Sequence, residues 1–152
     1  MGDESYSECR SKRVTVGLLG LGSIGLSVVQ LLHGGSGPQI VGALVQRPCG
    51  RGDIHDAPIV HSLNDLLELR PDVIAEVAGH SALKAYGPTI LRSQSDLVIV
   101  SVGALADQDF FNELQAAASA TGRTVEIVAG AIGALDAIAA ATVDGLGSGL
   151  ID

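Results

Sequence analysis

From residue 13 onward, short apolar runs rich in β-branched residues alternate with longer segments of helical periodicity. The apolar runs predict six strands, at residues 14–19, 39–45, 59–60, 72–77, 96–102 and 124–128. Periodicity and capping residues predict helices over 23–33, 62–69, 81–92, 107–120 and 133–143. Residues 47–57, which are rich in glycine and proline, are expected to form a loop.

Strands that alternate with helices are typical of an α/β fold, in which helices cover both faces of a parallel sheet. Right-handed crossovers then favour a doubly wound (Rossmann) sheet of about six strands in the order 3-2-1-4-5-6. We expect this domain to span residues 13–144, after a polar, mobile tail at residues 1–12. Residues 145–152 predict no element and are interpreted as the remnant of a linker.

Composition narrows the class of protein further. The chain has 152 residues, of which 47% are hydrophobic and 17% charged, which excludes intrinsic disorder. Its 20 glycines follow no three-residue period, which excludes collagen. The length fits one domain with a sizeable core.

Charge and aromatic content argue against a nucleic-acid partner. The net charge is −8, the 9 basic residues are scattered, and the aromatic residues are only 2 tyrosines and 2 phenylalanines. The two cysteines, Cys9 and Cys49, form no metal or disulfide framework and are interpreted as reduced thiols of a cytoplasmic protein. Residues 14–32 are uncharged, but their glycines and polar side chains argue against a membrane segment.

The sequence GLGSIG at residues 20–25 follows a predicted strand and opens a predicted helix, as a dinucleotide-binding loop requires. Gly20 permits the tight turn, Gly22 lets the backbone approach a pyrophosphate, and Gly25 allows close packing of the helix on the strand. Free amides at the helix start, at Ser23 and Ile24, then hold the negative charge. The alternative is an ordinary structural turn.

The second strand predicts which dinucleotide binds. An acidic residue at its end would hydrogen-bond the ribose 2′-hydroxyl of NAD, but Gln46 and Arg47 stand there. Arg47, with Arg51 as a second candidate, can instead pair with the 2′-phosphate of NADP. We therefore expect NADP, or tolerance of NAD and NADP, unless Arg47 is a solvated loop residue.

Three more segments follow predicted strands at the edge where ligands of such folds collect: residues 77–80, 101–104 and 129–133. All are rich in small residues, which permit close contact with a nicotinamide and its ribose. The candidates for this contact are Ala78, Gly79, Ser101, Val102 and Gly103. The alternative is that these segments are ordinary strand-to-helix turns.

Together, the segments 20–25, 76–80, 101–105 and 130–136 resemble the L-aspartate dehydrogenase family, from residue 14 to about 146. The resemblance implies reversible oxidative deamination of L-aspartate to oxaloacetate and ammonia through iminoaspartate, with NAD or NADP as hydride carrier. It also implies that Ala131 contacts the nicotinamide end of the cofactor. Members of that family continue into a second domain with a catalytic histidine and the substrate pocket, and we expect that domain to be missing here.

Other candidates for acid–base chemistry are weaker. His80 opens a helix near the expected nicotinamide and can act as an acid or base, or be a turn residue. Glu76 and Asp136 suggest an acid pair, but Glu76 lies inside an apolar strand, where a hydrogen-bonded structural carboxylate is equally expected. The remaining histidines, expected at the surface, are His33, His55 and His61.

The leading hypothesis is therefore the cofactor-binding part of an aspartate dehydrogenase, inactive alone, with aspartate as a partner only when the catalytic half is present. The alternatives are a stand-alone nucleotide-binding or redox-sensing module without catalysis, and another dehydrogenase or reductase with the same nucleotide half. Apolar surface left by an absent domain would favour a homo-oligomer.

Overall fold

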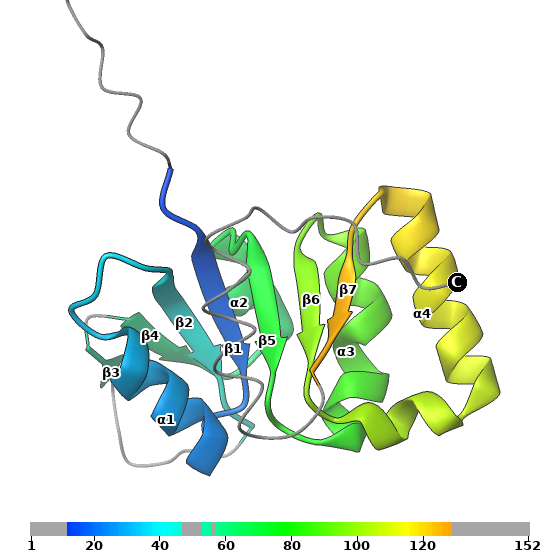
Figure 1. Cartoon of the computed structure of the whole chain (residues 1–152), viewed down its shortest axis with the longest axis horizontal. Helices are drawn as coiled ribbons and strands as arrows, with labels where there is room; N and C mark the ends of the chain where they lie inside the picture. The colour runs from blue at the N-terminus through cyan, green and yellow to red at the C-terminus, as the bar shows by residue number, and fades with distance from the viewer. Residues whose placement is uncertain (1–11, 47–52, 56, 129–152) are drawn as a thin grey trace, which may run out of the picture.

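The computed structural model of the chain describes residues 12–46, 53–55 and 57–128. In that part of the chain seven strands form one sheet, shown in Figure 1. The strands are β1 (Thr15–Leu19), β2 (Gln39–Leu44), β3 (Asp53–Ile54), β4 (Ala57–Val60), β5 (Val73–Glu76), β6 (Asp96–Ile99) and β7 (Val125–Ile127). The helices are α1 (Ser23–Leu32), α2 (Leu63–Glu68), α3 (His80–Arg92) and α4 (Gln108–Thr121), with a 3-10 helix, η1 (Val102–Ala106).

The sheet has the strand order β3-β4-β2-β1-β5-β6-β7. All neighbouring strands pair in parallel except β3 and β4, which are antiparallel. Without β3 the six parallel strands have the order 3-2-1-4-5-6, so the predicted Rossmann fold is confirmed. From β1 the sheet grows toward β2 on one side and toward β5 on the other, which makes the carboxyl edge between them the usual ligand position in such folds.

Helices pack on both faces of this sheet. Figure 1 shows α1 in front of the sheet, with α2 and α3 behind it. Leu63 of α2, Ile90 of α3 and Leu114 of α4 belong to one buried apolar cluster, whereas Val28 of α1 belongs to a second cluster on the other face. Because side chains alternate along each strand, β6 supplies Ile99 to the first cluster and Val98 to the second.

Capping residues that can be recognised in the sequence set the boundaries of two helices. The Ser62 hydroxyl accepts from the Asp65 amide at 3.1 Å at the start of α2, and the Asp107 carboxylate accepts from the Phe110 amide at 3.2 Å at the start of α4. α4 stops at Gly122, whose φ of +66° is the left-handed conformation that glycine adopts at low cost. These predicted starts and stops are confirmed.

The first difference from prediction is β3, which lies within the expected loop and forms a hairpin with β4, the strand expected at 59–60 that begins two residues earlier. β3 and β4 pair antiparallel through Asp53 with Pro58 and Ile54 with Ala57. Ile54 and Ala57 are buried in the apolar cluster that contains Val28. Two buried apolar residues are too few to give a periodic pattern. In a segment rich in glycine and proline, the sequence therefore predicts a loop and not a hairpin.

The second difference is the end of β6, which stops at Ile99 rather than at residue 102. The Ser101 amide donates to the Glu76 carboxylate at 3.0 Å, and the Val102 amide donates to the Val100 carbonyl at 2.9 Å. These bonds divert the chain from the sheet ladder into η1. The β-branched residues at 100 and 102 predict a longer strand. The strand ends earlier because a tertiary contact, the bond to Glu76, sets its end.

Asp72 joins β1 to β5 at the amino edge of the sheet. Its carboxylate accepts from the Thr15 amide at 2.9 Å and the Thr15 hydroxyl at 2.8 Å, and the Lys12 ammonium lies 3.3 Å away. Partial burial raises the pKa of Asp72, but the bonds from Thr15 and the charge of Lys12 lower it more, so that the net pKa lies below the usual value.

We expect Asp72→Asn to lower the free energy of unfolding at neutral pH. A carboxyl with a lowered pKa in the folded state stabilises the fold fully above the ordinary aspartate pKa of about 3.9, and this contribution is lost as pH falls through the lowered value. Urea unfolding of the wild type and the variant at pH 7 and at pH 2 checks this. A stability gap that is equal at both pH values contradicts the assignment.

Candidate dinucleotide site

The glycine loop, residues 20–25, leads from β1 into the first turn of α1 at the carboxyl edge of the sheet. Gly20 has a φ of +105°, and a Cβ built there would lie 2.8 Å from the Cα of Ala78. Its amide donates to the Leu44 carbonyl at 3.0 Å. The loop is thus packed against the segment after β5 and bonded to the end of β2, and only glycine fits at position 20.

Gly22 and Gly25 differ in what surrounds them. A Cβ on Gly25 would lie 2.7 Å from the Gly20 carbonyl oxygen and 3.4 Å from a Val77 methyl, so α1 starts in close contact with the loop. A Cβ on Gly22 would meet nothing within 4 Å, and Gly22 has an ordinary extended backbone with φ −78° and ψ −159°. Glycine is therefore needed inside the protein at position 25, whereas nothing within the described structure requires it at position 22.

The start of α1 offers backbone donors to a ligand. Gly22 is the N-cap without a side-chain cap, and the first turn contains no acidic residue. Amides of a first helical turn lack an intrahelical acceptor, and the earliest bond in α1 runs from the Leu26 amide to the Gly22 carbonyl at 2.9 Å. Ser23 is exposed and Ile24 half-buried. Free amides, the positive end of the helix dipole and a bare Gly22 together fit a phosphate group.

Glu76, the last residue of β5, is fully buried and ties the two neighbouring loops together. One carboxylate oxygen accepts from the amides of Ala78 and Gly79 at 2.9 and 2.7 Å and from the Ser101 hydroxyl at 3.0 Å. The other accepts from the Ser101 amide at 3.0 Å. This is the hydrogen-bonded structural carboxylate that the sequence permits, and it positions the loops after β5 and β6 beside the glycine loop.

His80 and Gly103 form the contact between these loops on the solvent side. His80 is exposed at the first turn of α3, and Gly79 before it has a φ of +118°. A Cβ on Gly103 would lie 2.6 Å from Cε1 and 2.9 Å from Nε2 of the His80 ring. The imidazole therefore covers the face of Gly103, and Val102 beside it is 39% exposed. Cofactor contact by these residues stays a prediction.

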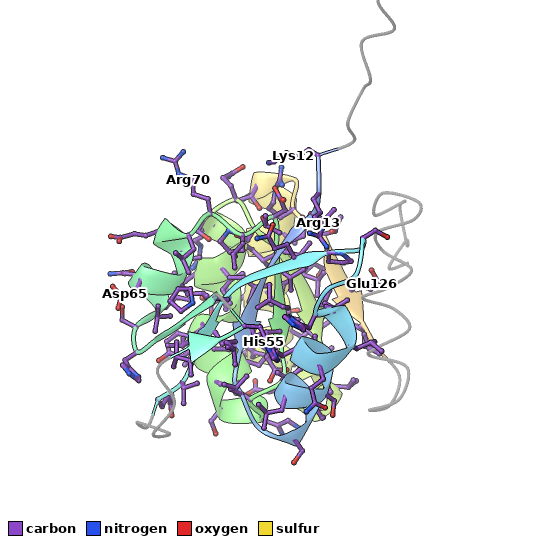
Figure 2. All side chains as sticks on the ribbon, turned by 90° about the vertical axis from the view of Figure 1, so that its left-hand side faces the viewer. Lys12, Arg13, His55, Asp65, Arg70 and Glu126 are labelled. Atoms are coloured by element: carbon purple, nitrogen blue, oxygen red, sulfur yellow. The ribbon has the colours of Figure 1, made fainter. Side chains whose placement is uncertain are left out.

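The adenosine end of the expected site is only partly described. Gln46 is exposed at the end of β2, whereas Arg47, Arg51, Ala131 and Asp136 lie outside the described residues, as do Cys9 and Cys49. The basic side chains of Lys12, Arg13 and Arg70 are spread over the upper end of the molecule in Figure 2, where β1 begins. They are therefore remote from the glycine loop and do not neutralise a ligand there.

The three remaining histidines are exposed, as expected. His33 and His55 stack on each other, with ring centroids 3.8 Å apart. His61 attaches to the end of β2, where its Nδ1 lies 2.8 Å from the Val45 carbonyl oxygen. That contact and the bond between Glu76 and Ser101 could not be predicted from the sequence, because each joins residues at the ends of two different strands. The one sequence signal for the bond of Glu76 is its position, because a glutamate inside an apolar strand needs hydrogen-bond donors.

The described part of the chain gathers no cluster of three or more histidine, cysteine, aspartate or glutamate side chains suited to a metal ion. Nor does it include a helix with the length and apolar character needed to cross a membrane.

A family model described as "Homoserine dehydrogenase, NAD binding domain" matches residues 20–127, which include the glycine loop and the strands from β2 to β7. The chain belongs to this family of NAD-binding domains. The match therefore gives a nicotinamide dinucleotide as the class of cofactor for this domain.

Individual relatives of the NAD-binding domain agree with the resemblance inferred from the motifs. The chain is 45% identical to the L-aspartate dehydrogenase of Ruegeria pomeroyi over 141 residues, 91% of this chain and 49% of that protein. It is 38% identical to the L-aspartate dehydrogenase of Archaeoglobus fulgidus over 127 residues, 84% of this chain and 51% of that protein. The chain spans about half the length of these curated relatives, and the predicted resemblance to L-aspartate dehydrogenases is confirmed.

A solved structure supports the same assignment. The crystal structure of aspartate dehydrogenase from Thermotoga maritima superposes with a TM-score of 0.64 at 26% identity, covering 83% of this chain and 50% of that one. The NAD-binding domain therefore shares its fold with this aspartate dehydrogenase.

Proposed function

We propose that the chain is the NAD(P)-binding part of an L-aspartate dehydrogenase. In the proposed reaction a bound NAD⁺ or NADP⁺ would supply the hydride acceptor for the oxidation of L-aspartate at Cα. The products are iminoaspartate, NAD(P)H and a proton, and water then converts iminoaspartate to oxaloacetate and ammonia. The residues of this chain bind and orient the dinucleotide.

The observation that carries this proposal is the continuity of three loops along one edge of the sheet. Gly20 packs directly on Ala78, and Glu76 joins the segment after β5 to Ser101 after β6. A dinucleotide whose pyrophosphate lies on Gly22 and the first amides of α1 can extend its nicotinamide along this edge. The contacts we assign to the nicotinamide end are those of Ala78, Gly79, Ser101, Val102 and Gly103, and of Ala131 outside the described residues.

We expect the chain to bind dinucleotide without turning over aspartate. The curated relatives are about twice as long as the matched region, so we propose that the catalytic groups come from the part that the match does not cover. Absorbance at 340 nm with L-aspartate and NAD⁺ or NADP⁺ checks turnover. Steady aspartate-dependent formation of NADH or NADPH by the purified chain would overturn this part of the proposal.

We further propose a preference for NADP, or tolerance of both cofactors, through Arg47. Arg47→Asp replaces a cation that can pair with the 2′-phosphate by an anion that repels it. The variant is expected to weaken NADPH binding at least tenfold, and NADH binding less. Fluorescence titrations with both cofactors measure the two effects, and equal losses would refute the assignment to the 2′-phosphate.

A further inference from the structure

The end of β2 carries no acidic residue, yet the structure attaches an exposed histidine to it. β4 lies next to β2 in the sheet, and the Val45 amide donates to the Val60 carbonyl at 2.9 Å. His61 follows Val60 directly, and its Nδ1 lies 2.8 Å from the Val45 carbonyl oxygen. The imidazole therefore lies beside the end of β2. In many dinucleotide-binding folds an acidic side chain in this region hydrogen-bonds the ribose 2′-hydroxyl.

The contact with Val45 fixes the tautomer of the ring. A carbonyl oxygen only accepts hydrogen bonds, so Nδ1 of His61 must carry the hydrogen. In the neutral imidazole Nε2 is then an acceptor with a free lone pair. It points away from Val45 on an exposed side chain, and no described residue hydrogen-bonds it. An uncharged acceptor suits a ribose hydroxyl, which needs an acceptor for its proton.

The same strand end connects this histidine to the glycine loop. The Gly20 amide donates to the carbonyl of Leu44, the residue before Val45. A dinucleotide with its pyrophosphate on the glycine loop directs its adenosine ribose toward the end of β2. We propose that His61 Nε2 accepts a hydrogen bond from the ribose 2′-hydroxyl and so takes the role of the absent acid. Because the neutral ring carries no negative charge, it does not repel a 2′-phosphate as a carboxylate does.

This inference rests on the proposed dinucleotide function, and a pair of ligands that differ by one hydroxyl tests it. 5′-AMP and 2′-deoxy-5′-AMP compete with NADH for the site, and displacement of NADH fluorescence gives their affinities. The wild-type chain is expected to bind 5′-AMP about three- to tenfold more tightly than its 2′-deoxy form, the usual range for one hydrogen bond.

Two substitutions separate the ring's contact with Val45 from its contact with the ligand. His61→Asn places an amide nitrogen near the position of Nδ1, so it can still donate to the Val45 carbonyl, but it has no atom at the position of Nε2. We expect this variant to melt as the wild type does and to bind both nucleotides equally. His61→Gln places an amide oxygen within reach of the Nε2 position, and we expect it to recover part of the preference for 5′-AMP.

His33→Ala serves as the matched control, because it removes another exposed histidine at the far end of α1. It is expected to leave the preference for 5′-AMP unchanged. A folded His61→Asn variant with the wild-type preference, or a wild type without preference, would overturn the role of His61 while dinucleotide binding stands. A wild-type chain that binds no NADH would overturn the proposed function itself.

Discussion

Replacing Gly22 with aspartate is expected to abolish dinucleotide binding while leaving the fold slightly more stable. A Cβ at this position meets nothing within 4 Å, and the backbone is in an extended conformation that aspartate adopts freely. As the N-cap of α1, aspartate can accept from a first-turn amide, which adds a few tenths of a kcal/mol over glycine. The same carboxylate occupies the proposed pyrophosphate position and repels it.

We expect the loss of NADH affinity in Gly22→Asp to be at least thirtyfold, or about 2 kcal/mol. Thermal unfolding and a fluorescence titration of the same preparation measure the two effects separately. Gly37→Asp is the matched control, because a Cβ there also meets nothing within 4 Å and Gly37 precedes β2 at the amino edge. If Gly22→Asp binds NADH as the wild type does, the pyrophosphate does not lie on this glycine.

The largest expected effect on stability comes from Glu76→Gln. The carboxylate of Glu76 receives four hydrogen bonds, three of them from backbone amides, at 2.7 to 3.0 Å. A glutamine of the same shape has one accepting oxygen, so its NH₂ group must face at least one amide donor. A buried donor without an acceptor, together with the loss of charge-assisted bonds, costs about 3 kcal/mol, or roughly 10 °C in melting temperature.

Calorimetry or urea unfolding of Glu76→Gln checks this value. Glu68→Gln is the control, because it makes the same chemical change at an exposed position on α2. The loops after β5 and β6 lose their common anchor in Glu76→Gln, so NADH affinity is also expected to fall. A variant within about 0.5 kcal/mol of the wild type, the range of ordinary surface substitutions, would show that the carboxylate does not hold these loops.

Much of the fold follows from local signals in the sequence. Ser62, Asp107 and Gly122 mark helix ends through bonds and dihedral angles that involve their own neighbours, and alternating strands and helices are enough to predict the parallel order. Prediction of an element or its end fails where a contact with a residue distant in the sequence determines it. Ile54 is held by burial against another element, and the end of β6 depends on a carboxylate 25 residues earlier in the chain.

The residues of the candidate site also divide into those that the sequence predicts and those that it does not. The glycine loop could be predicted because its GLGSIG pattern stands between a strand and a helix, and the φ of Gly20 and the close packing of Gly25 give two of its glycines a conformational or steric reason. The roles of Ser101 and His61 could not be predicted, because their partners lie far away in the sequence: Glu76 ends β5, and Val45 follows β2. Arg47 and Ala131 remain predictions from the sequence, since they lie outside the described residues.

The most direct test of dinucleotide binding at this sheet edge is a fluorescence titration of the 152-residue chain with NADH and with NADPH. We predict saturable binding of at least one of them at one site per chain, and its loss in the folded Gly22→Asp variant. A folded wild-type chain that binds neither cofactor would contradict the assignment of this sheet edge as a nicotinamide dinucleotide site.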